Sequence, residues 1–189
     1  MSDLPDVLKL PADLPVPADD GACDHLPGTA MPPIRLPATG GGAIDLGNLP
    51  AGRTTIYAYP RTRPPGEAAS DDWDMIPGAR GCTPETCSFR DHHAELRELG
   101  TSVWGLSTQP VPFQQEVVDR LHLPFALISD ERLELVNALR LPTMTFDAAT
   151  LIRRLTLVIR DNVVEHVFYP VFPPNGHAAE VRDWIAAHP

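Results

Sequence analysis

The sequence of 189 residues has little cysteine, an excess of acidic over basic side chains and no long apolar run. Its three cysteines are an odd number, which argues against a framework of paired disulfides. No stretch approaches the ~20 apolar residues of a membrane span. The opening residues MSDLPDVLKLPADLPVPADDG lack the basic and apolar regions of a signal peptide. We therefore expect a cytoplasmic protein whose thiols are kept reduced.

The charge balance limits the partners that the chain can bind. Lys+Arg 15 against Asp+Glu 25 gives a net charge of −10, which repels phosphate backbones and anionic membrane surfaces. We expect neither nucleic acid nor membrane as a partner. A hydrophobic fraction of 43% in a chain of this length is enough for one domain with a core of its own.

Proline is abundant and unevenly placed. The 22 prolines are frequent up to about residue 37 and again in the stretch from Pro60 to Gly81. The first region predicts an arm that lies on the surface or is partly disordered, and we place its boundary so that residues 1–26 are the arm and 27–189 the folded domain. The second region is a long loop, which in a compact domain is typically functional or disordered.

The remaining segments alternate between strand and helix patterns. We expect Thr83 and Asp130 to cap helices and Gly100 to end one. The expected strands cover 53–60, 101–107 and 125–129, the helices 84–99, 112–123, 130–139 and 176–188, and a hairpin over 151–172 turns at Asp161-Asn162. This order predicts an α/β protein with a thioredoxin-like fold, in which helices flank a mixed central sheet.

The stretch PGARGCTPETCSFRD, residues 77–91, carries two of the three cysteines. Cys82 lies at the predicted start of a helix, where unpaired N–H groups and the helix dipole stabilise an anion. Arg80 and Arg90 are close in sequence and are expected to add positive charge. Because the thiolate is the nucleophile, we expect Cys82 to be the more reactive thiol.

Cys87 follows five positions later on the same helix. Two helical residues at this spacing are offset by about 7.5 Å along the axis, whereas a disulfide needs Cα atoms within roughly 7 Å. The two sulfurs can therefore bond only after the first turns unwind. Other interpretations stay open at this point: a structural disulfide, a metal site with His92 or His93, or two inert buried thiols.

Beyond these patterns, GCTPETCSFRD resembles the active-site signature of the peroxiredoxins of the bacterioferritin comigratory protein, or peroxiredoxin Q, type. The resemblance extends over roughly residues 27 to 188. It continues through the segments ELGTSVWGLST, LHLPFALISD and RRLTLVIRDNVVEHVFYPV. The cysteine segment is the specific part, and the later segments follow it in the family's order.

The resemblance implies a thiol-dependent peroxidase that reduces hydrogen peroxide or organic hydroperoxides. Cys82 matches the peroxidatic cysteine, Cys87 the resolving cysteine that forms an intramolecular disulfide with it, and Arg154 the arginine that holds thiolate and peroxide. Glu85 matches the glutamate that supports this arginine. Thioredoxin or a glutaredoxin-like protein would be the reductant of a monomer or homodimer that needs no metal or organic cofactor.

The loop before Cys82 departs from the family pattern P-x-x-x-[TS]-x-x-C. Ala79 stands where the family has a hydroxyl that binds peroxide, and Met75 stands where it has proline. This departure keeps a second hypothesis, a non-enzymatic thioredoxin-like redox sensor or metal-handling protein. We expect no catalytic role for Cys23 and a core position for His93, whereas Trp73 either covers the site or anchors the loop.

Overall fold

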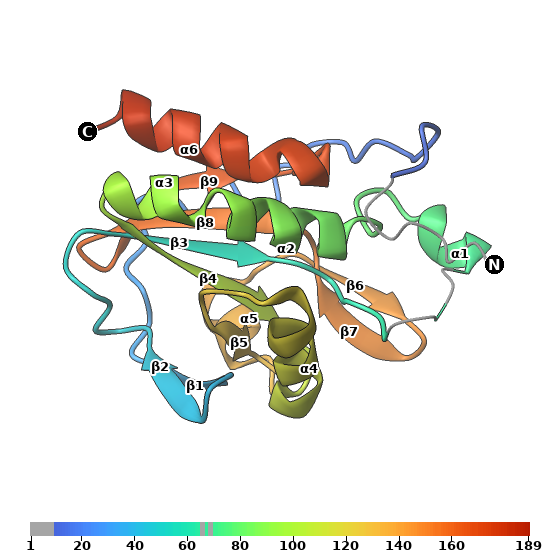
Figure 1. Cartoon of the computed structure of the whole chain (residues 1–189), viewed down its shortest axis with the longest axis horizontal. Coiled ribbons are helices and arrows are strands. Elements are labelled where there is room, and N and C mark those ends of the chain that lie inside the picture. The colour runs from blue at the N-terminus through green and yellow to red at the C-terminus, as the bar shows by residue number, and fades with distance from the viewer. Residues whose placement is uncertain (1–9, 65–66, 68–69) are drawn as a thin grey trace.

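A mixed sheet forms the centre of the computed structural model, which describes residues 10–64, 67 and 70–189 (Figure 1). In this part of the chain the sheet has seven strands in the order β2-β1-β5-β4-β3-β8-β9. Strands β3 (Arg53–Ala58), β4 (Thr101–Ser107) and β5 (Leu127–Ser129) are parallel. Next to β3, β8 (Leu155–Arg160) and β9 (Val163–Phe168) run as antiparallel neighbours. The predicted α/β architecture with a mixed sheet is confirmed.

Helices cover both faces of this sheet. Helices α2 (Cys82–Asp91), α4 (Val111–Leu121) and α6 (His177–Ala187) share one apolar cluster, and Figure 1 shows α6 beside α2. Helix α5 (Glu134–Leu139) packs into a second apolar cluster. All six residues of β3 are buried, as expected for a central strand that is covered on both faces.

Most predicted elements agree with the structure to within two residues at either end, but two helices differ. The helix expected over 84–99 begins at Cys82 and is divided at His92 into α2 and α3 (His93–Glu98). Thr83 is not its cap, because the N-cap is Gly81. Asp130 does accept bonds from two N–H groups of α5, but this helix begins only at Glu134.

The predicted hairpin turn is confirmed, whereas the beginning of that hairpin is wrong. Asp161 and Asn162 both have positive φ, 52° and 60°, as a two-residue type I′ turn requires. Residues before Arg153 belong to a different pair, β6 (Thr143–Phe146) with β7 (Ala149–Ile152), which forms a separate small sheet. Arg153 and Arg154 therefore lie at the junction between the two sheets.

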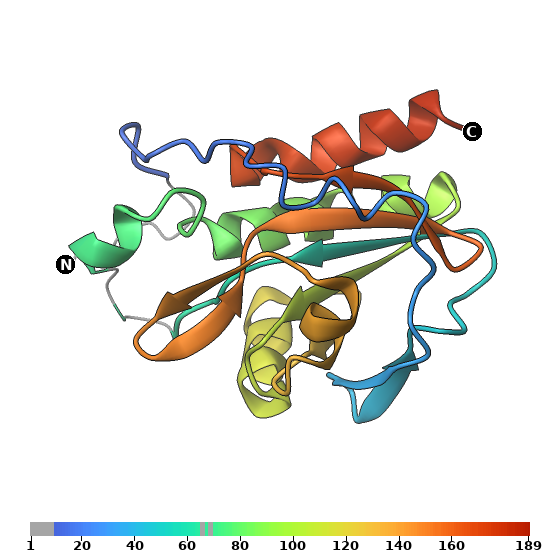
Figure 2. The same ribbon diagram turned by 180° about the vertical axis from the view of Figure 1, so that it is seen from behind.

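The N-terminal segment contributes more structure than the sequence predicts. It forms the unpredicted hairpin of β1 (Arg35–Ala38) and β2 (Gly42–Asp45). Residues 28–31 run along the edge strand β9 and bond its backbone, and Figure 2 shows this segment in blue along that edge of the sheet. The expectation of a surface arm up to residue 37 is wrong for four side chains, which are buried: Cys23, Leu26, Met31 and Leu36.

The long loop between Pro60 and Gly81 contains one short helix, α1 (Asp71–Asp74). A single 3₁₀ turn, η1 (Pro174–Gly176), precedes α6. Residues 1–9 of the expected arm, and 65–66 and 68–69 of the expected loop, lie outside the described residues. Within residues 10–64, 67 and 70–189, no helix combines the length and apolar character needed to cross a bilayer.

Candidate active site

Cys82 is the first residue of α2, and only 4% of its surface is exposed. The chain enters the helix through Gly81, whose φ of 105° is a left-handed conformation that favours glycine. A side chain at Gly81 would also run into the ring of Pro174. The sulfur therefore lies at the helix N-terminus, where the first N–H groups have no intrahelical partners and carry partial positive charge.

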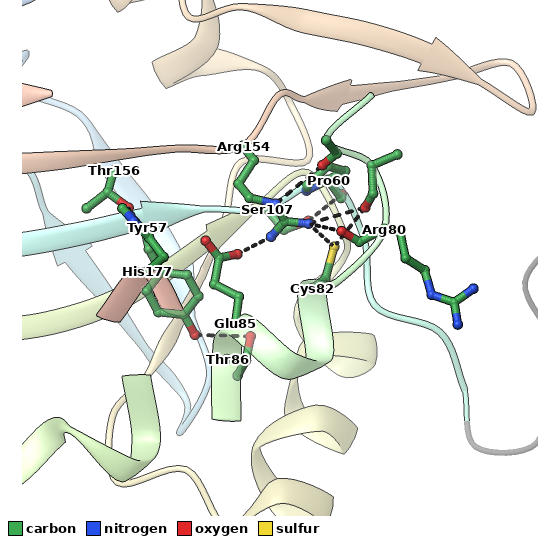
Figure 3. Close-up of polar contacts among 12 residues, drawn as sticks. Tyr57, Pro60, Arg80, Cys82, Glu85, Thr86, Ser107, Arg154, Thr156 and His177 are labelled. Carbon is green, nitrogen blue, oxygen red and sulfur yellow. Dashed lines mark hydrogen bonds and ion pairs between the residues drawn. The ribbon is translucent and has the colours of Figure 1, made fainter. Parts of the chain in front are cut away.

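Arg154 donates to this sulfur and to the loop that precedes it (Figure 3). Its Nη2 lies 3.2 Å from Cys82 Sγ and 3.2 Å from each of the carbonyl oxygens of Ala79 and Arg80. Its Nε donates to the carbonyl of Gly78 at 3.3 Å. Three successive carbonyls thus wrap one guanidinium, and this arrangement fixes the loop before α2.

Glu85 holds the opposite side of the same guanidinium. Its Oε2 accepts from Arg154 Nη1, and both side chains are buried. Burial raises the pKa of the Glu85 carboxyl, and the positive charge of Arg154 opposes that rise. Burial also works against the charge of Arg154, but Glu85 and Cys82 outweigh it and raise the pKa of the guanidinium. Arg154 is therefore a permanent cation beside the sulfur.

Ala79 contacts the site through its backbone rather than its side chain. Cys82 Sγ lies 3.6 Å from the Ala79 carbonyl oxygen, to which the thiol donates. The Ala79 methyl belongs to a small apolar cluster with Trp73 and Leu151. Trp73 is buried, and its ring packs on Phe146. Of the two roles considered for Trp73, these contacts favour anchoring the loop.

Cys87 lies in the interior of α2 and is nearly as buried as Cys82, at 7% exposure. Burial raises the pKa of the Cys87 thiol, Arg90 lowers it, Asp91 raises it, and the net result is a raised value. All three cysteines are free. Cys87 is therefore a protonated thiol at neutral pH, five residues along the helix from Cys82.

The two arginines expected beside Cys82 have other partners. Arg80 forms an ion pair with Asp74 at 2.5 Å, and Figure 3 shows its side chain directed away from the sulfur. Arg90 pairs with Asp91 and donates to the carbonyl of Leu121. The expectation that Arg80 supplies charge to Cys82 is wrong, because Arg154, directly before β8, does so instead.

Aromatic packing holds α2 in place. Phe89 stacks on Tyr57 of β3 with ring centroids 4.2 Å apart. The Tyr57 hydroxyl donates to Thr86 Oγ1 at 3.4 Å. On α6, His177 Nε2 lies 2.8 Å from Thr156 Oγ1 of β8. These partners of Phe89 follow from the strand register, which the sequence alone does not give.

The third cysteine, Cys23, and the histidines that follow Cys87 are not part of the network around Cys82. Cys23 packs in the apolar cluster that does not contain Cys82 and Cys87. Burial, followed by nearby aspartates, raises the pKa of the Cys23 thiol to about 12. His92 bonds the carbonyl of Ser88, and His93 is half-buried against Phe125. Among the described residues, no group of three or more His, Cys, Asp or Glu side chains is placed to hold a metal ion.

Comparison with known proteins agrees with this architecture. The Redoxin family model matches residues 26–184. Peroxiredoxin Q of Oryza sativa subsp. japonica is 29% identical over 154 residues, which are 81% of this chain and 63% of that protein. Peroxiredoxin Bcp of Escherichia coli is 27% identical over 168 residues, 85% of this chain and 96% of that one. The chain thus spans less than two thirds of the length of the rice protein, 63%, and nearly all of the bacterial one.

Solved structures of peroxiredoxins are also similar to this chain. The crystal structure of peroxidoxin BcpB from Mycobacterium tuberculosis has a TM-score of 0.69 at 25% identity and covers 87% of this chain and 99% of its own. Peroxiredoxin Q of Xanthomonas campestris shares the fold, with a TM-score of 0.66 at 21% identity. The chain therefore belongs to the redoxin family and, within it, to the peroxiredoxins of the peroxiredoxin Q and bacterioferritin comigratory protein type. The predicted thioredoxin-like fold is confirmed.

Proposed function

We propose that this protein is a thiol-dependent peroxidase that reduces hydrogen peroxide and organic hydroperoxides. The observation that carries the proposal is the contact of Arg154 Nη2 with Cys82 Sγ, 3.2 Å apart at the N-terminus of α2. A buried cation next to a thiol favours the thiolate, which is the nucleophile. The relatives named as peroxiredoxins support the same chemistry.

In the first step the Cys82 thiolate attacks the terminal oxygen of R–O–O–H. An S–O bond forms and the O–O bond breaks, so that sulfur is oxidised by two electrons to sulfenic acid and the peroxide is reduced. The leaving R–O⁻ takes a proton from solvent and departs as alcohol or water. Arg154 donates toward the sulfur and toward the charge that develops on the oxygens, and Glu85 keeps the guanidinium in place.

In the second step the Cys87 thiol attacks the Cys82 sulfenic acid. A disulfide forms, and water leaves with the sulfenic oxygen. Since both residues belong to α2, the first turns of the helix have to unwind before the sulfurs meet. Glu85 lies between the two cysteines, so this unwinding also withdraws its carboxylate from Arg154. Conversion of the thiolate to a neutral sulfenic acid removes one anion from Arg154, which weakens the folded site at the moment when Cys87 approaches.

In the third step an external dithiol reduces the Cys82–Cys87 disulfide by exchange. We propose a protein of the thioredoxin or glutaredoxin class as this reductant. The thiols supply the electrons, and Arg154 stabilises the negative charge on the sulfur and the peroxide oxygens. The proposed cycle therefore requires no metal or organic cofactor. A cytoplasmic location, a monomeric or homodimeric state and an arm ending at residue 26 remain predictions.

Peroxide consumption by cysteine variants tests the proposal. In the presence of a dithiol reductant, Cys82→Ser should consume hydrogen peroxide no faster than buffer. Cys23→Ser, the matched control from the opposite apolar cluster, should retain the wild-type rate. Consumption by Cys82→Ser at the wild-type rate would refute the assignment. Oxidation of wild-type Cys82 no faster than that of free cysteine would instead support the redox-sensor hypothesis.

A further inference from the structure

A cavity of about 290 Å³ lies between the active-site loop and the N-terminal segment. This volume is just below the range of roughly 300–1,000 Å³ that is typical of small-molecule sites. Arg154 and Gly78 belong to its lining, and both also belong to the network around Cys82. Arg154 therefore borders both the cavity and the Cys82 sulfur, although Cys82 itself does not line the cavity.

Most of the cavity wall is apolar. The loop contributes Ile76 and Pro77, the small second sheet contributes Met144, and the chain after β9 contributes Pro170 and Val171. Such a lining favours the burial of hydrocarbon over water, at about 25 cal/mol per Å² of apolar surface.

The remaining wall comes from the arm, which precedes the part of the chain that the family model matches. Pro17 and Ala18 line the cavity. A Cβ built on Gly78 would lie 3.5 Å from the Pro17 ring, so the arm contacts the active-site loop directly.

A polar cluster attaches the arm to the rest of the protein, and the charged side chains that line the cavity are in ion pairs. Arg153 Nη1 lies 2.8 Å from Asp20 Oδ2 and 3.3 Å from the Tyr169 hydroxyl. The Tyr169 hydroxyl donates to Asp20 Oδ1 at 2.8 Å. The three charged residues of the lining are therefore all in ion pairs: Arg153 pairs with Asp20, and Arg154 pairs with Glu85. An anionic substrate would have to displace one of these carboxylates.

We propose that the arm is a specificity-determining element that makes this protein favour hydroperoxides with an uncharged, apolar organic group. The cavity holds the organic group while the O–O–H end reaches Arg154 and Cys82. This inference rests on the proposed peroxidase function and adds the substrate class. Hydrogen peroxide, which has no organic group, gains nothing from the cavity, so the arm should discriminate between the two kinds of substrate.

Filling the cavity from the arm tests this inference. Ala18→Trp should lower kcat/KM for cumene hydroperoxide by at least about tenfold, as expected when a hydrophobic pocket loses its contacts. The kcat/KM for hydrogen peroxide should stay within about twofold of the wild-type value. Val16→Trp is the matched control, because Val16 is 65% exposed on the same arm and does not line the cavity. It should leave both substrates unchanged.

A second variant does not depend on a bulky side chain. Asp20→Asn weakens the attachment of the arm to Arg153 and Tyr169. It should therefore also lower the ratio of kcat/KM for cumene hydroperoxide to kcat/KM for hydrogen peroxide. If Ala18→Trp affects both peroxides equally, or neither, the arm is not a specificity element and the inference fails. If the wild-type protein fails to reduce hydrogen peroxide, the proposed function itself fails, so the two failures are distinguishable.

Discussion

Arg154 Nη2 lies 3.2 Å from Cys82 Sγ, although 72 residues separate the two along the chain. The strand register accounts for this approach. Leu155, the first residue of β8, pairs with Ala58, the last residue of β3. Arg154 therefore lies at the end of β3 from which the chain leaves to form the active-site loop. The carbonyls of that loop and the sulfur that follows it then converge on one guanidinium.

Arg154→Lys tests the importance of the guanidinium shape. A lysine retains the charge, but its ammonium is a point charge that cannot bind the three loop carbonyls, Glu85 and Cys82 together. We expect the second-order rate of peroxide reduction to fall by about 10²–10³, the usual effect of losing one preorganised donor. Arg160→Lys, at the far end of the strand β8 that follows Arg154, is the control, because its side chain is 41% exposed. Equal rates for these two variants would show that charge alone is sufficient.

Glu85→Gln tests the buried ion pair as a source of stability. The variant leaves a buried guanidinium without its carboxylate, which typically costs about 3–5 kcal/mol. Urea denaturation should therefore show a large decrease in the free energy of unfolding. Glu95→Gln breaks the exposed pair with Arg182 and should cost less than about 1 kcal/mol. If Glu85→Gln is as stable as Glu95→Gln, Glu85 does not stabilise the site.

Ala79→Thr tests whether the missing hydroxyl could be restored. The Ala79 side chain packs with Trp73 and Leu151, so a hydroxyl there would be buried among apolar groups. We expect no gain in peroxidase rate and a loss of about 1–3 kcal/mol relative to Ala79→Val, which has the same shape without the hydroxyl. A faster reaction in Ala79→Thr would instead mean that the hydroxyl faces the peroxide.

The raised pKa of Cys23 predicts that the stability of the protein depends on pH. Its pKa is about 12 in the folded protein against an ordinary value near 9, so between these values the unfolded chain has lost a proton that the folded protein retains. The contribution is therefore fully present below pH 9 and decreases by up to about 1.4 kcal/mol per pH unit as the pH rises toward 12. Denaturation of wild type and Cys23→Ala across this range should show a steeper decline in the wild type. Parallel declines would mean that Cys23 is not protected from ionisation.

Local signals in the sequence predicted much of the fold. The central strand over 101–107, the turn at Asp161-Asn162 and the helix start near Cys82 all carry strong patterns and agree with the structure. The short pair β6 and β7 carries no such pattern. Its turn places Asp147 and Ala148 at positive φ, 49° and 60°, and an alanine there gives no turn signal. Strands of four residues depend on tertiary pairing, which local composition does not reveal.

The site could be predicted only in part. The cysteines were found from the sequence because their spacing on a helix is itself informative, whereas Arg154 was found through the family resemblance. Sequence proximity favoured Arg80, which instead pairs with Asp74. The loop carbonyls and the arm wall were missed because backbone acceptors and contacts between distant segments leave no pattern in the residues. These features depend on the strand register and on the path of the arm.

Mass spectrometry of the protein after one equivalent of hydrogen peroxide tests the central claim most directly. In Cys87→Ser, a sulfenic-acid trapping reagent should label Cys82 alone, with Cys23 remaining a thiol. In the wild type, the same treatment should give a Cys82–Cys87 disulfide and no trapped sulfenic acid. Labelling of Cys87 or Cys23 before Cys82, or a wild-type protein that forms no disulfide between Cys82 and Cys87, would contradict the proposed peroxidase cycle.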